Sequence, residues 1–492
     1  MADGTRFTRR DMLRFAAGAA VWAAVGRSGS SARAETLAAP AIARRPRRPN
    51  ILMLVGDDHR HNAINALGDP IVQTPCLDRL AASGMAFTHA HDMGGHFPAV
   101  CVPTRASLMT GCSVFRALSD QKDDIIAPQR VTLGQHLRRT GYHTHCVGKW
   151  HNDLASLNRS FAGGEAIFRR GVTTDQYQLR VHHFDPTGVY ANNTVYHPRK
   201  FSTDLFADTA IDFLHNYRGA EPFFLYTAFT APHDPRTPPK RFADLYPPDK
   251  IPVPPNFASA HPFDNGELHI RDEDLAPHPR TPQRIQREIA AYYGMVSSVD
   301  TGIGRILAAL EASGQADNTI VVYTADHGIA LGQHGLLGKQ NLYDHSVRVP
   351  LIMRGPGIAA GQRSDALLYS WDLFPTLCDL AGIDSPADLD ARSLLPLLRG
   401  EHTQHRAYVE ALYRDCQRMV KNDRWKLIEY AVGPDRHTQL FDLANDPWEQ
   451  RNVAAAPEAA AELATLRRRL QGWQTAVGDT FPLNHAANRA SA

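Results

Sequence analysis

Runs of consecutive apolar residues recur along the chain, and such runs predict strands that are buried on both faces. The runs cover Ile51–Val55, Tyr142–Val147, Pro222–Phe229 and Thr319–Tyr323. Between them, apolar residues recur at helical spacing over Thr132–Arg139 and over Ile285–Leu310. Because strands alternate with helices, the pattern predicts an α/β domain built on a mostly parallel sheet with flanking helices.

The pattern changes near residue 400. Short strand patterns separated by polar turns cover Ala407–Glu410, Gln417–Lys421, Trp425–Tyr430 and Thr438–Asp442, and a helical pattern follows over Pro457–Val477. We expect a small antiparallel sheet with one covering helix. The predicted domains are therefore 49–400 for the α/β domain and 401–485 for a C-terminal α+β subdomain. The stretch Asp153–Arg199 has little periodicity, and we interpret it as an insertion of loops.

The first 34 residues are typical of an export signal. Arg9 and Arg10 precede a short apolar stretch, Phe15–Val25, and Ala32-Arg33-Ala34 resembles a cleavage site. We predict a twin-arginine signal peptide over 1–34 and a linker over 35–48, so the expected location is the periplasm of a bacterium or the medium. The alternative is a frayed basic N-terminus.

Composition and charge narrow the function classes. The chain has 492 residues, 43% of them hydrophobic and 21% charged, which is a globular composition. A net charge of +2 gives no reason to expect nucleic acid as a partner. Six cysteines without a C-x-x-C pair predict neither a disulfide framework nor a zinc knuckle. No apolar run reaches the roughly 20 residues of a membrane-spanning helix, so we expect no transmembrane anchor. These limits favour an enzyme.

Charged and imidazole side chains follow the predicted strands at the point where each strand ends. They are Asp57, Asp58 and Arg60 after the first strand, Lys149 and His151 after the second, His233 after the third, and Asp326 and His327 after the fourth. The carboxyl ends of parallel strands meet at one edge of a sheet, where ligands bind. We therefore expect these side chains to form one site.

Three carboxylates at one sheet edge indicate a divalent cation, because like charges at short range are costly without one. Asp57, Asp58 and Asp326 offer hard oxygen ligands, and His327 offers one nitrogen. Mostly oxygen ligation favours Ca²⁺, Mg²⁺ or Mn²⁺ over Zn²⁺. Taken alone, Asp57-Asp58 could instead cap a helix N-terminus, and the alternative for Asp326-His327 is similar.

The segment Cys101-Val102-Pro103-Thr104-Arg105 is the sharpest local signal in the chain. Proline suits the first turn of a helix, which puts Cys101 at a helix N-terminus, where backbone N–H groups favour an anion. Arg105 lies one turn further along, where its guanidinium can bind an oxyanion or orient the group at position 101. The other five cysteines are predicted to be buried thiols.

With these motifs the chain resembles the type I, formylglycine-dependent sulfatases of the alkaline phosphatase superfamily. The resemblance covers about Pro49 to Val453. It includes C-x-P-x-R at Cys101–Arg105, the segments at Gly148–His151, Ala231–His233, Thr324–Gly328 and Gly338–Tyr343, and L-F-D-L-x-N-D-P at Leu440–Pro447. It implies an alkaline-phosphatase-like fold and hydrolysis of sulfuric esters. At position 327 many members carry Asn and others His, which leaves the metal preference open.

The resemblance also implies a role for each motif residue. Cys101, oxidised to formylglycine by a maturation enzyme and hydrated, is the implied nucleophile. A divalent metal, Ca²⁺ before Mn²⁺ or Mg²⁺, is implied at Asp57, Asp58, Asp326, His327 and the group at 101. Lys339 and His233 would hold the sulfate, and one of them would protonate the leaving oxygen. His151, helped by Lys149, would take a proton from the hydrated aldehyde, and Arg105 would support the site.

The substrate contacts are less well defined by the sequence. Arg60, His96 and His182 are candidate substrate-binding residues, although each histidine is more readily explained as a structural or exposed residue. We expect the cavity walls to come from the Asp153–Arg199 insertion, the His89–Ala99 segment and the C-terminal subdomain.

Three hypotheses follow for the function. The first is a sulfuric ester hydrolase that acts on a sulfated carbohydrate or a small sulfate ester. The second is a phosphonate monoester or phosphodiester hydrolase on the same scaffold, because tetrahedral oxyanions suit one pocket. The third is a sulfated-glycan binding protein whose Cys101 stays a thiol.

Overall fold

The computed structural model describes residues 47–120 and 122–482, which belong to one compact unit. The predicted signal peptide (1–34), nearly all of the predicted linker (35–48) and residues 483–485 of the predicted subdomain lie outside the described residues. Within the described ranges, no helix is long and apolar enough to cross a bilayer. Of the five cysteines predicted to be buried thiols, Cys112, Cys146 and Cys378 are buried, whereas Cys76 and Cys416 are only half-buried.

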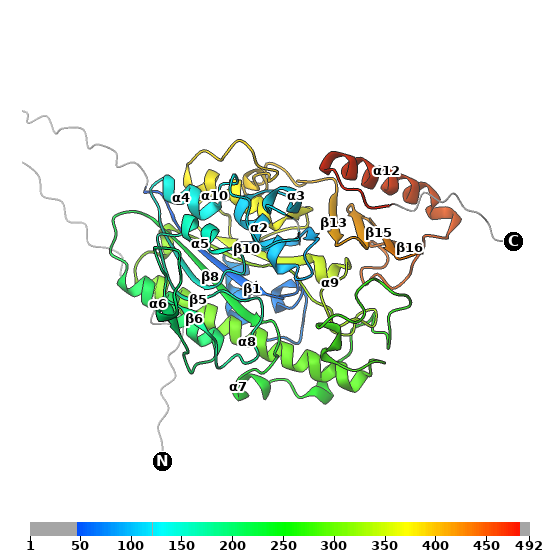
Figure 1. Cartoon of the computed structure of the whole chain (residues 1–492), viewed down its shortest axis with the longest axis horizontal. Coiled ribbons are helices and arrows are strands. Elements are labelled where there is room, and N and C mark those ends of the chain that lie inside the picture. The colour runs from blue at the N-terminus through cyan, green and yellow to red at the C-terminus, as the bar shows by residue number, and fades with distance from the viewer. Residues whose placement is uncertain (1–46, 121, 483–492) are drawn as a thin grey trace, which may run out of the picture. The chain divides into compact units, whose positions relative to one another are not determined.

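The predicted α/β architecture is confirmed (Figure 1). The larger sheet has 11 strands among the described residues, and a central parallel block runs in the order β9-β1-β8-β4-β5. Antiparallel β10 joins β9 to β2 at one side. The strands, in spatial order, are β11 (Gln362–Ser364), β2 (Met85–His91), β10 (Arg348–Arg354), β9 (Thr319–Ala325), β1 (Asn50–Asp57), β8 (Phe223–Pro232), β4 (His143–Lys149), β5 (Gly163–Phe168), β6 (Val181–His182) and β7 (Val195–Tyr196), with β12 (Leu368–Tyr369) beside β2.

Alternate residues of β1 bury into two different cores, because successive side chains of a strand point to opposite faces. Ile51, Met53 and Val55 join one apolar cluster, and Leu52 and Leu54 join the other. The first cluster is covered by α2 (Cys101–Thr110), α4 (Leu133–Arg139), α5 (Leu154–Ser160), α10 (Leu373–Ala381) and α11 (Leu395–Leu398). The second is covered by α1 (Pro75–Ala82), α6 (Ser202–Asn216) and α8 (Pro282–Ala312).

The remaining elements are short or belong to the second sheet. The short helices are α3 (Val114–Ala117), α7 (Lys240–Ala243) and α9 (Asp344–Val347). Single 3-10 turns cover Asn65–Leu67, Asn192–Thr194, Pro248–Lys250, Glu273–Leu275, Ala316–Asn318, Ser370–Asp372 and Pro457–Ala459.

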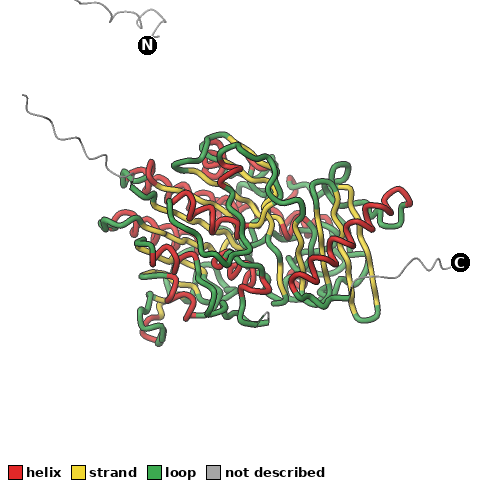
Figure 2. The backbone as a smooth tube through the Cα atoms, turned by 90° about the horizontal axis from the view of Figure 1, so that it is seen from above, coloured by secondary structure: helices red, strands yellow, loops and turns green. Residues whose placement is uncertain are grey.

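The second sheet is antiparallel with one covering helix, as the sequence predicts. Its order is β16 (Asp435–Asp442), β15 (Trp425–Val432), β14 (Gln417–Lys421), β13 (Val409–Tyr413) and β3 (Gly94–Gly95). Helix α12 (Ala460–Val477) lies across these strands (Figure 2) and buries Leu466, Leu470 and Trp473 against them. The fifth strand, β3, pairs parallel with β13 and comes from the segment before α2. The second sheet therefore extends into the α/β domain, and the boundary at residue 400 stays a prediction.

The stretch Asp153–Arg199 differs from the expected insertion of loops. It contains α5 and three strands, and β5 pairs parallel with β4 as part of the larger sheet. Two glycines open β5 and only its last three residues are buried, so no continuous apolar run marks this strand. A strand of this kind lacks the apolar run on which the prediction depends.

Gly148 provides a test of how tightly β4 packs against β8. Its φ is +86°, and a Cβ there would lie 2.0 Å from the carbonyl oxygen of Ala228. Gly141 has a similar φ of +96° but nothing within 4 Å of its Cβ position. We predict that Gly141→Ala costs about 1 kcal/mol of unfolding free energy, from backbone strain alone. Gly148→Ala costs at least ~2 kcal/mol more, because the backbones must separate. Urea unfolding of both variants measures the difference, and equal losses would contradict the close approach.

Candidate active site

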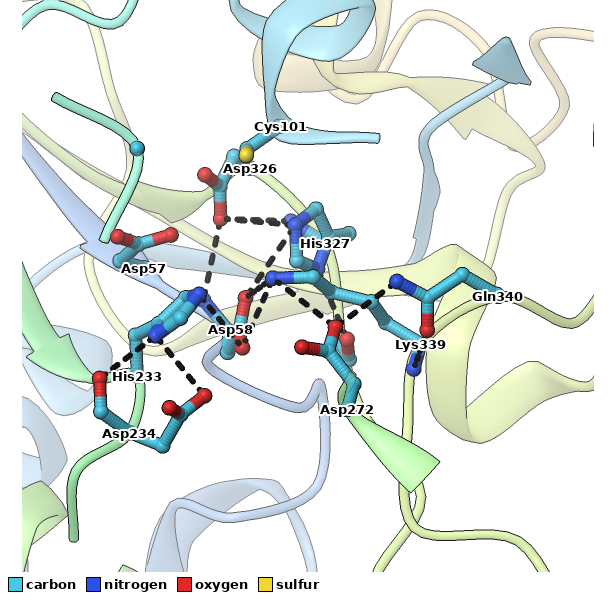
Figure 3. A network of polar contacts seen from close by, with 12 residues as sticks. Asp57, Asp58, Cys101, His233, Asp234, Asp272, Asp326, His327, Lys339 and Gln340 are labelled. Carbon is cyan, nitrogen blue, oxygen red and sulfur yellow. Dashed lines mark hydrogen bonds and ion pairs between the residues drawn. The ribbon is translucent and has the colours of Figure 1, made fainter. Parts of the chain in front are cut away.

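The site lies where four neighbouring strands of the larger sheet end. Strand β1 ends in Asp57 and is followed by Asp58, while β9 is followed by Asp326 and His327. Strand β4 ends in Lys149. Strand β8, between β1 and β4, is followed by His233. The structure therefore brings together the side chains that follow the predicted strands, with the exception of Arg60, and Figure 3 shows Asp58, His233, Asp326 and His327 in one network.

The acidic cluster is compact and buried. One ligand atom each from Asp57, Asp58, Asp326 and His327 lies within 4.8 Å of the others, and each residue is at most 1% exposed. The backbone holds this arrangement, because the amides of Asp58 and His327 donate to Oδ1 of Asp326 at 3.1 and 3.0 Å. Asp58 has a left-handed φ of +63°, a strained conformation for a residue with a Cβ.

The donor atoms of this cluster fit a divalent cation. Nδ1 of His327 lies 2.9 Å from the carbonyl oxygen of Gly328, which leaves Nε2 facing Asp58 Oδ1 at 3.3 Å. Nε2 of His327 and Oδ1 of Asp57 are buried without a hydrogen-bond partner. Three carboxylates and one imidazole nitrogen are a hard, mostly oxygen ligand set. The four residues can therefore hold one cation.

The protonation of the cluster without a metal supports the same conclusion. Burial and the charge of Asp326 raise the pKa of Asp57 to about 7, despite Lys149 nearby. Burial lowers the pKa of His327, but Asp326 and Asp58 outweigh it and raise the pKa to about 10. Protons on Asp57 and His327 thus offset part of the negative charge of the cluster, the charge that a metal ion would also offset.

Each carboxylate also forms an ion pair with a positively charged side chain. Nε and Nη2 of Arg105 both lie 3.0 Å from Asp326 Oδ2. Lys149 Nζ lies 2.5 Å from Asp57 Oδ2. Lys339 Nζ donates to both oxygens of Asp58 at 2.8 and 3.1 Å. The single charges neutralise part of the cluster and fix the orientation of its carboxylates.

Cys101 is the first residue of α2 and is 1% exposed. Its Sγ lies 3.0 Å from Nδ1 of His151 and belongs to the same group of potential ligands as Asp326 and His327. Burial raises the pKa of the Cys101 thiol, but His151 and Lys149 hold it well below its usual value. A thiolate is the form of this side chain that reacts.

A cavity of about 370 Å³ opens onto Cys101, His151, His233 and Lys339. We call it the catalytic cavity. Its walls come from three segments: Pro98 and Ala99, Arg170 to Val172, and Ile270 to Asp272 with Gln340. The first two segments confirm part of the sequence-based expectation. The C-terminal sheet contributes no lining residue among those described, so that part of the expectation was wrong.

The three candidate substrate contacts do not line the catalytic cavity. Arg60 lines a different cavity, because the chain turns away from the cluster after Asp58. His96 is held by an ion pair with Asp415, with Nδ1 3.2 Å from Oδ1. His182 is buried in β6, where Nδ1 lies 3.0 Å from Thr194 Oγ1. The assignment of these three residues to substrate binding stays a prediction.

A second group of polar side chains, which the sequence did not single out, surrounds Lys339 and His233. Asp272 Oδ2 accepts from Gln340 at 2.8 Å and lies 3.9 Å from Lys339 Nζ. Asp234 Oδ1 lies 3.1 Å from His233 Nδ1. Gln340 and Asp234 each adjoin a motif residue, which was an available signal. Asp272 lies in a stretch without any pattern.

Comparison with known proteins defines the family. The model described as Sulfatase matches residues 49–383, and a model described as N-sulphoglucosamine sulphohydrolase, C-terminal, matches residues 332–476. Since the first match covers more than half of the chain, the protein belongs to the sulfatase family. It is an enzyme that hydrolyses sulfate esters, as the motifs predict.

Relatives and solved structures agree over nearly the full length. An arylsulfatase of Clostridium perfringens is 28% identical over 86% of this chain and 93% of its own. A structure in complex with its substrate D-glucosamine-2-N,6-O-disulfate has a TM-score of 0.72 and 25% identity, over 89% of this chain and 100% of the other. A phosphonate monoester hydrolase from Silicibacter pomeroyi has a TM-score of 0.68 and 26% identity, over 88% and 96%.

The pKa values predict that cation binding releases protons, because the ligands bind in their deprotonated forms. At pH 6, below the pKa of both Asp57 and His327, release approaches about two protons per ion. At pH 8.5 Asp57 is already ionised, and release falls to about one. Affinity therefore rises with pH. Calorimetric titration of the metal-free protein in two buffers of different ionisation enthalpy measures the release, and a pH-independent value would contradict the assignment.

Proposed function

We propose that the protein releases sulfate from a sulfated carbohydrate or small sulfate ester, using a divalent cation and Cys101 converted to formylglycine. Asp57, Asp58, Asp326 and His327 would hold the cation, with Ca²⁺ preferred and Mn²⁺ or Mg²⁺ as alternatives. When present, the metal and the hydrated aldehyde supply a charge-stabilised oxygen nucleophile for attack on sulfur. The observation that carries the proposal is the buried acidic cluster beside Cys101, a residue that itself lines the catalytic cavity.

His151 is the proposed base. Its Nδ1 lies 3.0 Å from the Sγ of Cys101, the atom that oxygen replaces on conversion to formylglycine. That distance is within reach for proton transfer. Burial lowers the pKa of His151, which leaves the ring neutral and able to accept a proton. Removal of a proton from the second hydroxyl of the sulfated hydrate would regenerate the aldehyde and release sulfate.

Lys339 and His233 are the proposed sulfate-binding residues, and both line the catalytic cavity. Burial lowers the pKa of Lys339, but Asp58 and Asp272 hold it well above its usual value. A group with so high a pKa is a poor proton donor at neutral pH. We therefore propose that Lys339 stays positively charged and binds the sulfate. His233 would protonate the leaving oxygen.

The proposed substrate class is a sulfated saccharide or a small sulfate ester. The match to the C-terminal model of N-sulphoglucosamine sulphohydrolase and the likeness to a structure that binds a sulfated glucosamine support a sugar. Phosphonate monoester hydrolysis remains the second candidate, favoured by the likeness to the enzyme from Silicibacter pomeroyi. The sulfated-glycan binding protein has no comparable support.

We also propose that the protein is exported from the cytoplasm in its folded state. The Arg9-Arg10 pair followed by Phe15–Val25 supports twin-arginine export to the periplasm. Folded export would let a maturation enzyme oxidise Cys101 before transit.

The function is tested by sulfate release from sulfated saccharides and an aryl sulfate, beside the matching aryl phosphonate ester. We predict faster turnover of the sulfates and its loss in Cys101→Ala, because the nucleophile is removed. The tryptic peptide that spans Cys101 should be lighter than the cysteine form and should react with a hydrazide. Full activity alongside an unmodified thiol would refute the aldehyde mechanism, and faster phosphonate turnover would favour the second candidate.

Lys149 provides a test of the point-charge contact with Asp57. The side chain is fully buried and donates to Asp57 Oδ2 and to Gly171 O at 2.5 and 2.8 Å. A planar guanidinium does not fit both acceptors, so we predict that Lys149→Arg lowers kcat at least ~10-fold. Lys240→Arg is the matched control, because Lys240 is 87% exposed. Equal turnover of the two variants, measured on the same substrate, would contradict the assignment.

The export proposal predicts that Arg9→Lys with Arg10→Lys retains the protein in the cytoplasm, because the paired arginines are the recognised signal. Fractionation of cells that express the full chain measures the distribution. Unchanged periplasmic yield would contradict export by this route.

A further inference from the structure

A second cavity, which shares no lining residue with the catalytic cavity, lies beside the loop that follows β1. Its volume is about 240 Å³. We call it the Arg60 cavity; it is lined by Arg60, His61, Asn62, Leu67, Gly68, Asn256, Gln333, Asp344, His345, Arg348, Pro447, Trp448 and Glu449. Trp448 is 36% exposed, and Gly68 and Pro447 are also exposed, so the cavity is open to solvent.

Arg60 carries a buried charge without a counterion. The residue is 5% exposed, and Nε and Nη1 have no hydrogen-bond partner. No ion pair joins its guanidinium to a carboxylate within residues 47–120 and 122–482. Burial of an unpaired ion is costly, and a native protein compensates it with a partner of opposite charge or with a bound ligand.

The two carboxylates that line the cavity are already paired with other cations. Asp344 binds Lys426 at 2.9 Å through Oδ1, and Lys421 at 2.7 Å and Arg348 at 3.0 Å through Oδ2. Glu449 Oε1 lies 2.7 Å from Lys426, and Oε2 accepts from the amide of Asp344 at 2.8 Å. Four cationic side chains, Arg60 included, thus face two carboxylates, and the excess charge is positive.

The histidines of the cavity respond to this excess. Burial and the charge of Arg348 hold the pKa of His61 well below its usual value, and Asp344 offsets only part of that shift. Nε2 of His345 is buried without a hydrogen-bond partner and can donate to a ligand as the neutral ring. A positive cavity with spare N–H groups suits an anion.

We propose that the Arg60 cavity is a second anion-binding site that takes a small oxyanion, either free sulfate or the carboxylate of a sugar acid. The guanidinium of Arg60 would bind two oxygens of the ligand at once, which is the geometry that arginine offers and lysine does not. The inference does not depend on the proposed function, since it follows from the unpaired charge of Arg60.

A metal ion is the competing occupant, because His334, His345 and Glu449 offer ligand atoms within 4.8 Å of one another. Two observations favour the anion. The ammonium of Lys426 already lies 2.7 Å from Glu449 Oε1, where a metal would bind. His334 Nε2 already lies 3.1 Å from the side-chain nitrogen Nδ2 of Asn256, which occupies the position of a metal–ligand bond. A cation would also add to a positive excess.

Tryptophan emission of the full-length protein tests the site, because Trp448 lines the Arg60 cavity and is far more exposed than the buried Trp150, Trp371 and Trp473. Sodium sulfate and sodium glucuronate are titrated separately, at ionic strength matched with sodium chloride. We expect a saturable change with at least one of them, and its absence in Trp448→Phe. The anion that saturates at the lower concentration distinguishes free sulfate from a sugar carboxylate.

Two variants assign the signal to Arg60. Arg60→Gln should weaken the anion at least ~10-fold, since charge-assisted hydrogen bonds are lost, while Arg139→Gln, at an exposed position, should not. Asn62→Asp places a fixed carboxylate in the cavity, so it should abolish the response and raise the unfolding temperature in anion-free buffer. No saturable change in the wild type, a wild-type response in both cavity variants, or saturable quenching by Zn²⁺ alone would overturn the proposal.

Discussion

The close packing of three carboxylates at the carboxyl end of the central sheet is the constraint on which the rest of the site depends. Asp57, Asp58 and Asp326 lie within 4.8 Å of one another and are cut off from water. Coulomb repulsion at that range and depth is tolerable only if positive charge is held among the carboxylates. The chain supplies that charge from three elements that are distant in sequence, namely α2, the end of β4 and the loop that carries Lys339. The arrangement exists only in the folded protein, because strand order makes β9, β1, β8 and β4 neighbours.

This convergence of side chains is accompanied by local strain in the backbone. Asp58 and His151 both have left-handed φ values, +63° and +66°. Asp58 directly follows the last residue of β1, and His151 lies two residues after the last residue of β4. A strand continued in extended geometry would send alternate side chains to opposite faces of the sheet. The left-handed turn lets Asp58 stay with Asp57 in one cluster, and lets His151 approach Cys101. Strained backbone of this kind is typical of functional sites, where the surrounding structure holds it in place.

The sequence predicted those parts of the structure whose signal is local. Buried strands such as β1 and β9 read as apolar runs, and their boundaries extend by only one or two residues beyond the prediction. The metal-ligand candidates followed, because parallel strands place their ends together. Pairing of β3 with β13 could not be seen, since two glycines carry no pattern. The sequence could not show that Arg60 lines a different cavity from Cys101, because the direction of the chain after Asp58 is a property of the fold. Asp272 was missed because only the folded loop brings it to Lys339.

The two cavities show how one loop separates charge of opposite sign. Asp58 and Arg60 are two residues apart, a spacing at which an Asp and an Arg could readily neutralise each other. Instead, Asp58 binds Lys339 and Arg60 lines the other cavity, where the carboxylates are saturated by Lys421, Lys426 and Arg348. Direct pairing of Asp58 with Arg60 would remove one oxygen ligand from the acidic cluster and the spare charge from the Arg60 cavity. Lys339 compensates Asp58 within the protein itself, whereas no such partner is described for Arg60. The charge left without a counterion in the loop after β1 is therefore that of Arg60, and the burial of this charge is costly.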